Sequence, residues 1–241
     1  MDMSEKLKTI AENEQKVYAA GMQKQYDEFW DAFQDYGKRT NYNRAFASGG
    51  WQNTVTFRPK YDIKPAECYM MFSGNWLNID LVEYLDSLGV VFDTSNVYQY
   101  QYAFQGTYFT RLGVIDMQKA TINHAMCEGC KYLHTIDKLI FSEKTVTHSQ
   151  MFSNCTALKN ITCEGVLADN LNLQWSTLLT KLSIESVFPC LSNTASGKTV
   201  TLSKTAVNNA FETGTGLADG STSDEWNNLI ATKSNWTIAL V

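Results

Sequence analysis

The stretch Met151-Phe152-Ser153-Asn154-Cys155-Thr156-Ala157-Leu158-Lys159-Asn160-Ile161 decides the expected fold, because its opening phrase occurs four times in the chain. The other copies are 71–75, 103–107 and 126–130, so successive starts lie 32, 23 and 25 residues apart. In the last two copies a leucine follows the methionine by seven positions and an isoleucine by ten. A period of roughly 20 to 30 residues with fixed apolar positions is typical of stacked units that share one core. The sequence therefore predicts a solenoid.

Size and composition limit the classes to which the protein can belong. The chain has 241 residues, of which 44% are hydrophobic, so it is too apolar for a disordered protein. Its formal net charge is −5, and only 19% of its residues are charged. A negative chain is a poor match for nucleic acid or for an anionic membrane surface. We therefore expect no nucleic-acid partner. No apolar run reaches the roughly 20 residues of a membrane span, so we also expect no membrane insertion.

The N-terminal residues 1–38 are predicted to form one long, coiled-coil-like helix. The segment contains no proline, and its apolar residues first follow spacings of three and four before they widen into an aromatic stripe. The helix could pack on the C-terminal part of its own chain. The seam instead favours self-association, as a homotrimer, or docking to another protein. The residues expected between chains are Leu7, Ile10, Val17, Phe29, Trp30 and Phe33.

The rest of the chain is divided into a connector at 39–67 and a domain at 68–241, with a terminal cap from about residue 192. Between the phrase copies lie short β-like runs, and a strand paired with a tight turn is the composition of a leucine-rich-repeat unit. The predicted fold class is α+β: a long N-terminal helix, then a leucine-rich-repeat solenoid with a C-terminal αβ cap. The expected elements near the C-terminus are helices at 182–191, 204–211 and 224–233 (the last with Ser223 as N-cap) and strands at 199–203 and 236–241.

Cys127 and Cys130 form a C-x-x-C pair near His124 and His134, and two Cys with two His can bind zinc. The repeat explains both cysteines without a metal, since Cys127 stands where the other copies have Phe and Cys130 where the last copy has Cys155. The chain has no second C-x-x-C pair, so we expect no metal and no cofactor. The six cysteines are interpreted as small buried residues made in a reducing cytoplasm.

Catalytic motifs are also weak. The segment 196–199 imitates the end of a phosphate-binding loop, but it lacks the earlier glycine and leads into a predicted strand rather than a helix. The histidines His124, His134 and His148 have no matching nucleophile and acid in the sequence. No pair of acids recurs at a spacing that indicates a glycosidase. The protein is therefore expected not to be an enzyme.

One candidate binding stretch has alternating tyrosines, Val97-Tyr98-Gln99-Tyr100-Gln101-Tyr102. In a strand, all three rings would lie on one face. An exposed tyrosine face suits contact with a glycan or a protein. The alternative is that the rings pack in the core beside Phe104. The candidate ligand-binding residues are thus Tyr98, Tyr100 and Tyr102, with both interpretations open.

The phrase and the leucine and isoleucine that follow it, as in 151–161, resemble the BspA-like (Treponema-type) leucine-rich repeats. The opening from Glu5 to Trp30 is similar to the N-terminal segment of prophage-encoded repeat proteins of Gram-positive gut bacteria, and the ending at 197–203 and 236–238 looks like the same group. The resemblance implies a virion or surface protein. It brings no catalytic residues with it.

These observations give an expected function. The protein is predicted to be a non-enzymatic phage or prophage virion protein, associated with a tail, fibre or baseplate, that binds a bacterial envelope glycan or protein through its repeat domain. Its expected partners are its own copies and other virion proteins. Because residues 1–8 do not resemble a secretory signal, we expect synthesis in the bacterial cytoplasm and incorporation into the virion. The alternative is a bacterial cell-surface adhesin or host-interaction protein.

Overall fold

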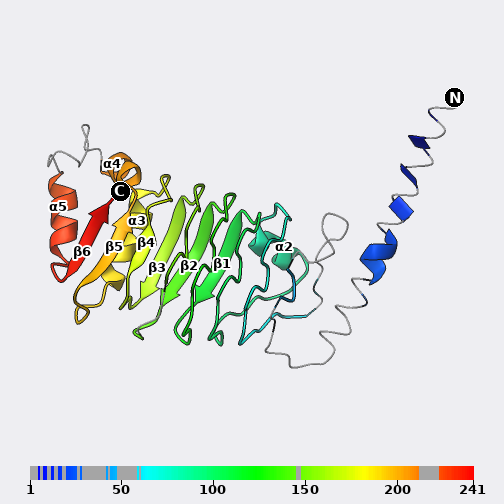
Figure 1. Cartoon of the computed structure of the whole chain (residues 1–241), viewed down its shortest axis with the longest axis horizontal. Coiled ribbons are helices and arrows are strands. Elements are labelled where there is room, and N and C mark those ends of the chain that lie inside the picture. The colour runs from blue at the N-terminus through cyan, green and yellow to red at the C-terminus, as the bar shows by residue number, and fades with distance from the viewer. Residues whose placement is uncertain are drawn as a thin grey trace.

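A computed structural model describes residues 61–144, 148–211 and 223–241, together with single residues and short stretches before position 61. Its strands follow one another across the molecule in chain order, as Figure 1 shows. They form two separate three-stranded sheets, and every strand pair is parallel. The first sheet contains β1 (Arg111–Asp116), β2 (Thr135–Phe141) and β3 (Asn160–Gly165), and the second contains β4 (Leu171–Leu173), β5 (Lys198–Leu202) and β6 (Trp236–Leu240).

Short helices lie between and beside these strands, namely α2 (Leu81–Ser87), α3 (Lys181–Cys190), α4 (Lys204–Ala210) and α5 (Asp224–Ala231). Each begins at a residue whose side chain accepts a hydrogen bond from the first turn: Asp80, Thr180, Ser203 and Ser223. Local sequence therefore sets where each helix starts.

The repeated phrase forms a turn with left-handed backbone at both ends. The residue before each copy has a positive φ, as do the residues at its fourth position: Met70 and Gly74, Tyr102 and Gly106, Ala125 and Gly129, Gln150 and Asn154. Glycine and asparagine adopt this conformation most readily, which explains the composition of the fourth position. This conformation directs backbone N–H and C=O groups along the stacking direction, where they form hydrogen bonds with the next copy. These bonds include Phe72 N to Ala103 O (2.7 Å), Phe104 N to Met126 O (2.8 Å) and Cys127 N to Met151 O (2.9 Å).

A further copy of the phrase, missed in the sequence, precedes the first one. Arg44 has a φ of 56°, like the residue before every other copy. Phe46 donates its N–H to Met71 O at 2.7 Å, and its ring stacks on that of Phe72 with centroids 5.0 Å apart. Phe72 in turn stacks on Phe104 at 5.4 Å. The second position of the phrase thus builds a buried column of aromatic rings.

The fifth position carries a buried hydrogen-bond donor. In three copies its side chain donates to the carbonyl of the second residue in the preceding copy: Asn75 Nδ2 to Phe46 O (3.2 Å), Cys130 Sγ to Phe104 O (2.9 Å) and Cys155 Sγ to Cys127 O (2.9 Å). These bonds satisfy carbonyls that water cannot reach. Asparagine and cysteine therefore make the same contact at this position.

Helix α3 lies against β3 in the place that another strand would occupy. Ser183 Oγ accepts from Ile161 N at 3.0 Å and donates to Lys159 O at 3.2 Å. Ser186 Oγ accepts from Cys163 N at 3.1 Å and donates to Ile161 O at 3.2 Å. Two hydroxyl groups thus replace the backbone partners of a strand, and the first sheet ends at β3.

The predicted fold class is wrong. We expected α+β with a long coiled-coil-like N-terminal helix, a leucine-rich-repeat solenoid and a cap. The described residues instead form a small α/β structure with two three-stranded parallel sheets and short helices, and no long N-terminal helix or solenoid is seen among them. The physical reason is that the stacked turns do not each carry a strand. The first units contribute isolated bridges only, such as Glu67 with Gln99, and α3 interrupts the series after β3.

Several individual elements were nevertheless predicted correctly. Helices α3, α4 and α5 and strands β5 and β6 lie within two residues of their expected bounds, and Ser223 is the N-cap of α5. The expected strand at 97–102 is wrong, because only Gln99 makes a bridge there and Tyr102 is left-handed. The expected end of the N-terminal helix at residue 38 lies outside the described residues.

Substitution of two glycines by alanine would test how closely this backbone is packed. Both Gly106 and Gly165 have a positive φ, but a Cβ on Gly106 would meet open space, whereas one on Gly165 would overlap the Phe141 carbonyl oxygen. Gly106→Ala should lower the free energy of unfolding by about 1 kcal/mol, the cost of left-handed backbone. Gly165→Ala should lower it by about 3 kcal/mol, since it adds a steric clash to the same cost. Urea unfolding of the two variants measures the difference, and equal losses would contradict the packing described.

Candidate functional site

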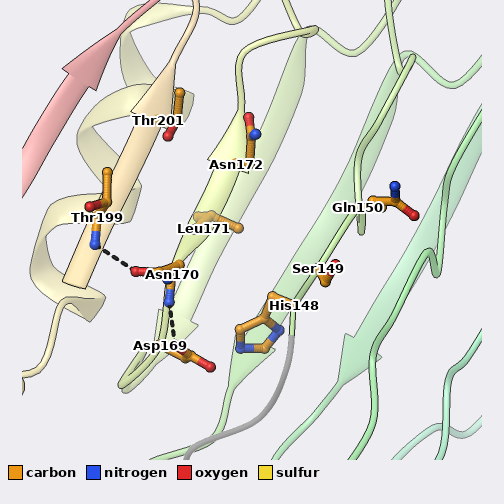
Figure 2. Close-up of a pocket in the computed structure, with 9 residues that line it drawn as sticks. All are labelled: His148, Ser149, Gln150, Asp169, Asn170, Leu171, Asn172, Thr199 and Thr201. Atoms are coloured by element: carbon orange, nitrogen blue, oxygen red, sulfur yellow. Dashed lines mark hydrogen bonds between the residues drawn. The ribbon is translucent and has the colours of Figure 1, made fainter.

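A polar pocket of about 430 Å³ lies between the turn before the last phrase copy and the second sheet. Figure 2 shows one side formed by the consecutive residues His148, Ser149 and Gln150, and the other by strand β5, with strand β4 between them. The lining residues are His148, Ser149, Gln150, Asp169, Asn170, Leu171, Asn172, Thr199 and Thr201.

The alternation of the two strands places polar side chains in this pocket. In β4, Leu171 and Leu173 are buried, so Asn172 between them points outward. In β5 the buried residues are Val200 and Leu202, and the outward ones include Thr201, which is in register with Asn172. The pocket surface is thus the polar face of strands whose apolar face lies in the core.

Hydrogen bonds fix the two asparagines. Asn170 Oδ1 accepts from Thr199 N at 2.7 Å (Figure 2), and Asn172 Oδ1 accepts from Gln174 N at 3.0 Å. Both amide oxygens are therefore directed to the backbone. The amide nitrogens and the threonine hydroxyls make no hydrogen bond within the part of the chain that the structure describes, so they are available to a ligand.

One ion pair borders the pocket. Asp169 Oδ1 accepts from Lys198 Nζ at 2.8 Å and from the Asn170 N–H at 2.8 Å. Burial opposes ionisation of Asp169, but these hydrogen bonds and the Lys198 charge outweigh it and hold the pKa of the carboxyl below its usual value. Both side chains are therefore charged at neutral pH, and the two opposite charges offset each other.

His148 is only 5% exposed, and burial lowers its pKa to about 4. Its ring meets Phe141 edge to face, and its Nδ1 lies 3.4 Å from Asn123 Nδ2. Ser149 and Asp169 line the same pocket, but neither makes a hydrogen bond to the imidazole among the described residues. A triad needs both of those bonds. The described residues around this imidazole therefore form no complete Ser-His-Asp chain of hydrogen bonds.

The three candidate tyrosines do not share an exposed face. Tyr98 is 40% exposed and its hydroxyl donates to Glu67. Tyr100 is fully buried, with its hydroxyl donating to Asp116 O at 2.7 Å. Tyr102 is partly buried and meets Tyr69 and His124 edge to face. The core interpretation is therefore correct for Tyr100, and ligand binding by Tyr98 and Tyr102 stays a prediction.

The sequence reasoning missed a row of surface aromatics formed by Trp76, Tyr108 and Tyr132. Trp76 and Tyr108 are nearly parallel with centroids 5.9 Å apart, and Tyr108 and Tyr132 are 4.6 Å apart. Each follows a phrase copy by one or two positions, which was the available signal. Because the rings stack on one another, much of their face area is already in contact within the row. We interpret this row as support for the stacked turns.

The C-x-x-C pair lies in the core rather than in the pocket. Cys127 and Cys130 are fully buried, whereas His134 is exposed and His124 contacts Tyr102. Burial raises the pKa of the Cys127 thiol well above its usual value. All six cysteines are free, and among the described residues no group of three or more His, Cys, Asp or Glu is arranged to hold a metal ion.

The candidate self-association residues can be placed only in part. Val17 is 73% exposed in the single chain. The other residues of that set lie outside the described residues: Leu7, Ile10, Phe29, Trp30 and Phe33. Self-association through residues 1–38 stays a prediction.

Comparisons with models of protein families, with curated proteins and with solved structures find no match to this chain. In the part of the chain that the structure describes, no helix combines the length and apolarity needed to cross a bilayer.

The buried imidazole makes stability depend on pH. The folded protein holds His148 neutral down to a pKa of about 4, whereas the unfolded chain protonates it near 6.5. Its contribution is therefore complete above pH 6.5 and is lost as the pH falls toward 4, with a loss of about 2 kcal/mol at pH 5. Urea unfolding at pH 7 and pH 5 measures this. His148→Gln, which cannot take up the proton, should lose markedly less stability over the same interval, and an unchanged pH dependence would contradict the assignment to His148.

Proposed function

We propose that this chain is a non-enzymatic protein of a phage or prophage particle that binds a component of the bacterial envelope through the polar pocket. The observation that carries the proposal is the pocket itself. On a backbone fixed by hydrogen bonds it gathers amide and hydroxyl groups that have no partner among the described residues. Such a surface can hold a polar ligand in place through several hydrogen bonds at once.

The particle setting is supported by sequence resemblance. The phrase with its following leucine and isoleucine resembles the BspA-like (Treponema-type) repeats. The segment from Glu5 to Trp30 is similar to the N-terminal segment of prophage-encoded repeat proteins of Gram-positive gut bacteria. We propose that residues 1–38 attach the chain to its own copies, as a homotrimer, or to other virion proteins. A cell-surface adhesin would bind its ligand through the same chemistry. It would differ from a virion protein only in its location, on the bacterial cell.

Binding to cells tests the proposal. The fluorescently labelled full chain should sediment with at least some members of a panel of Gram-positive gut bacteria. Replacing both Thr199 and Thr201 by Val keeps the β-branched shape but removes two pocket hydroxyls, and should weaken that binding by about tenfold. Thr237→Val is the matched control, because Thr237 lies beside Thr199 on β6, is exposed and does not line the pocket.

Two outcomes would contradict the proposal. One is the absence of binding to every strain in the panel. The other is release of soluble sugar or peptide fragments from the cells during incubation, which would show that the protein is an enzyme.

Self-association is tested separately by light scattering on the full chain and on a chain that begins at residue 39. The full chain should have about three times the mass of one copy, because its apolar seam is expected to lie between chains. The shortened chain should be monomeric. A monomeric full chain at micromolar concentration would be incompatible with this part of the proposal.

A further inference from the structure

The pocket offers both donors and acceptors, at defined positions. The amide oxygens of Asn170 and Asn172 already accept from the backbone. These two side chains therefore offer a ligand their amide nitrogens, which are donors. The hydroxyls of Thr199 and Thr201 can donate or accept. All four groups line one side of the pocket, on adjacent paired strands. A ligand that matches them needs several hydroxyl or carbonyl groups spread over its surface.

Charge within the pocket is balanced. Asp169 contributes the carboxylate, and Lys198 binds it at 2.8 Å. His148 is buried and neutral at pH 7, since burial holds its pKa near 4. The remaining lining side chains are uncharged. An anionic ligand would meet the Asp169 carboxylate, and a cationic ligand would find that carboxylate already paired, so neither sign of charge is favoured.

Size and polarity narrow the ligand further. A volume of about 430 Å³ lies within the range of small-molecule sites. Such sites are usually apolar, but the one aliphatic residue of this lining is Leu171. The ligand must therefore be small and polar over most of its surface.

Resting on the proposed function, we infer that the pocket binds a neutral sugar residue of the bacterial envelope. Sugar hydroxyls pair with the amide nitrogens and threonine hydroxyls, and the Asp169 carboxylate can accept from one hydroxyl through its second oxygen. The ion pair with Lys198 keeps that carboxylate in position.

The test uses isotope-labelled full-length protein and NMR titration at pH 7. The neutral probes are glucose, galactose, mannose, rhamnose and N-acetylglucosamine, and the charged probes on the same ring are glucuronic acid and glucose 6-phosphate. At least one neutral sugar should shift the backbone signals of 148–150 and 169–172 in a saturable way. The Thr199→Val, Thr201→Val double variant should bind that sugar about tenfold more weakly. Thr237→Val should bind as the unmodified chain does.

The inference is overturned if none of the neutral sugars shifts these signals, or if a charged probe binds more tightly than its neutral counterpart. Its failure is distinct from failure of the proposed function. If the double variant loses cell binding while no neutral sugar binds, the pocket recognises another class of ligand, such as a peptide, and the proposed function stands. If a neutral sugar binds in the pocket but the protein binds no cells, the ligand chemistry stands and the proposed function fails.

Discussion

The structure depends on the backbone hydrogen bonds between copies of one left-handed turn. Each copy must place two residues in a conformation that most side chains avoid, and it does so because the bonds to the next copy repay that cost. Glycine or asparagine relieves the strain at the fourth position. At the position before the phrase no glycine occurs, and Met70, Tyr102 and Gln150 adopt the left-handed conformation there.

The pocket follows from the way this stack meets the second sheet. The residues that enter the last phrase copy, 148–150, line the pocket beside β4 and β5, with His148 buried and the next two residues exposed. The short strand β4 offers one outward side chain, Asn172, and β5 supplies the threonines. Their position is fixed by parallel pairing, so the polar groups are preorganised, which is what a binding site requires.

The sequence predicted the parts whose signals are local. Ser223 as an N-cap, helix α4 and strand β5 follow from capping residues and alternation within a few positions. The phrase itself was recognised from its repetition. The copy at Arg44 and Phe46 was missed because its neighbours differ from the later copies.

Features set by contacts between distant residues could not be predicted. The end of the first sheet depends on Ser183 and Ser186, whose role requires knowing that α3 lies against β3. Tyr100 can be buried because its hydroxyl finds a partner in Asp116 O, and alternation alone cannot show that contact. The pocket was missed for the same reason, since His148 and Thr201 are far apart in the chain. Only the outward positions of Asn172 and Thr201 could have been read from alternation.

Parallel sheets carry a hazard at their edges, where free N–H and C=O groups can recruit a strand from another molecule. Strand β3 would present such an edge, with Ile161 and Cys163 N–H groups pointing outward. The serine hydroxyls of α3 occupy those groups, and the helix itself blocks the approach of an extended chain. Wherever copies of this chain lie close together, the arrangement opposes edge-to-edge joining of their sheets through β3 and leaves contact between copies to other surfaces.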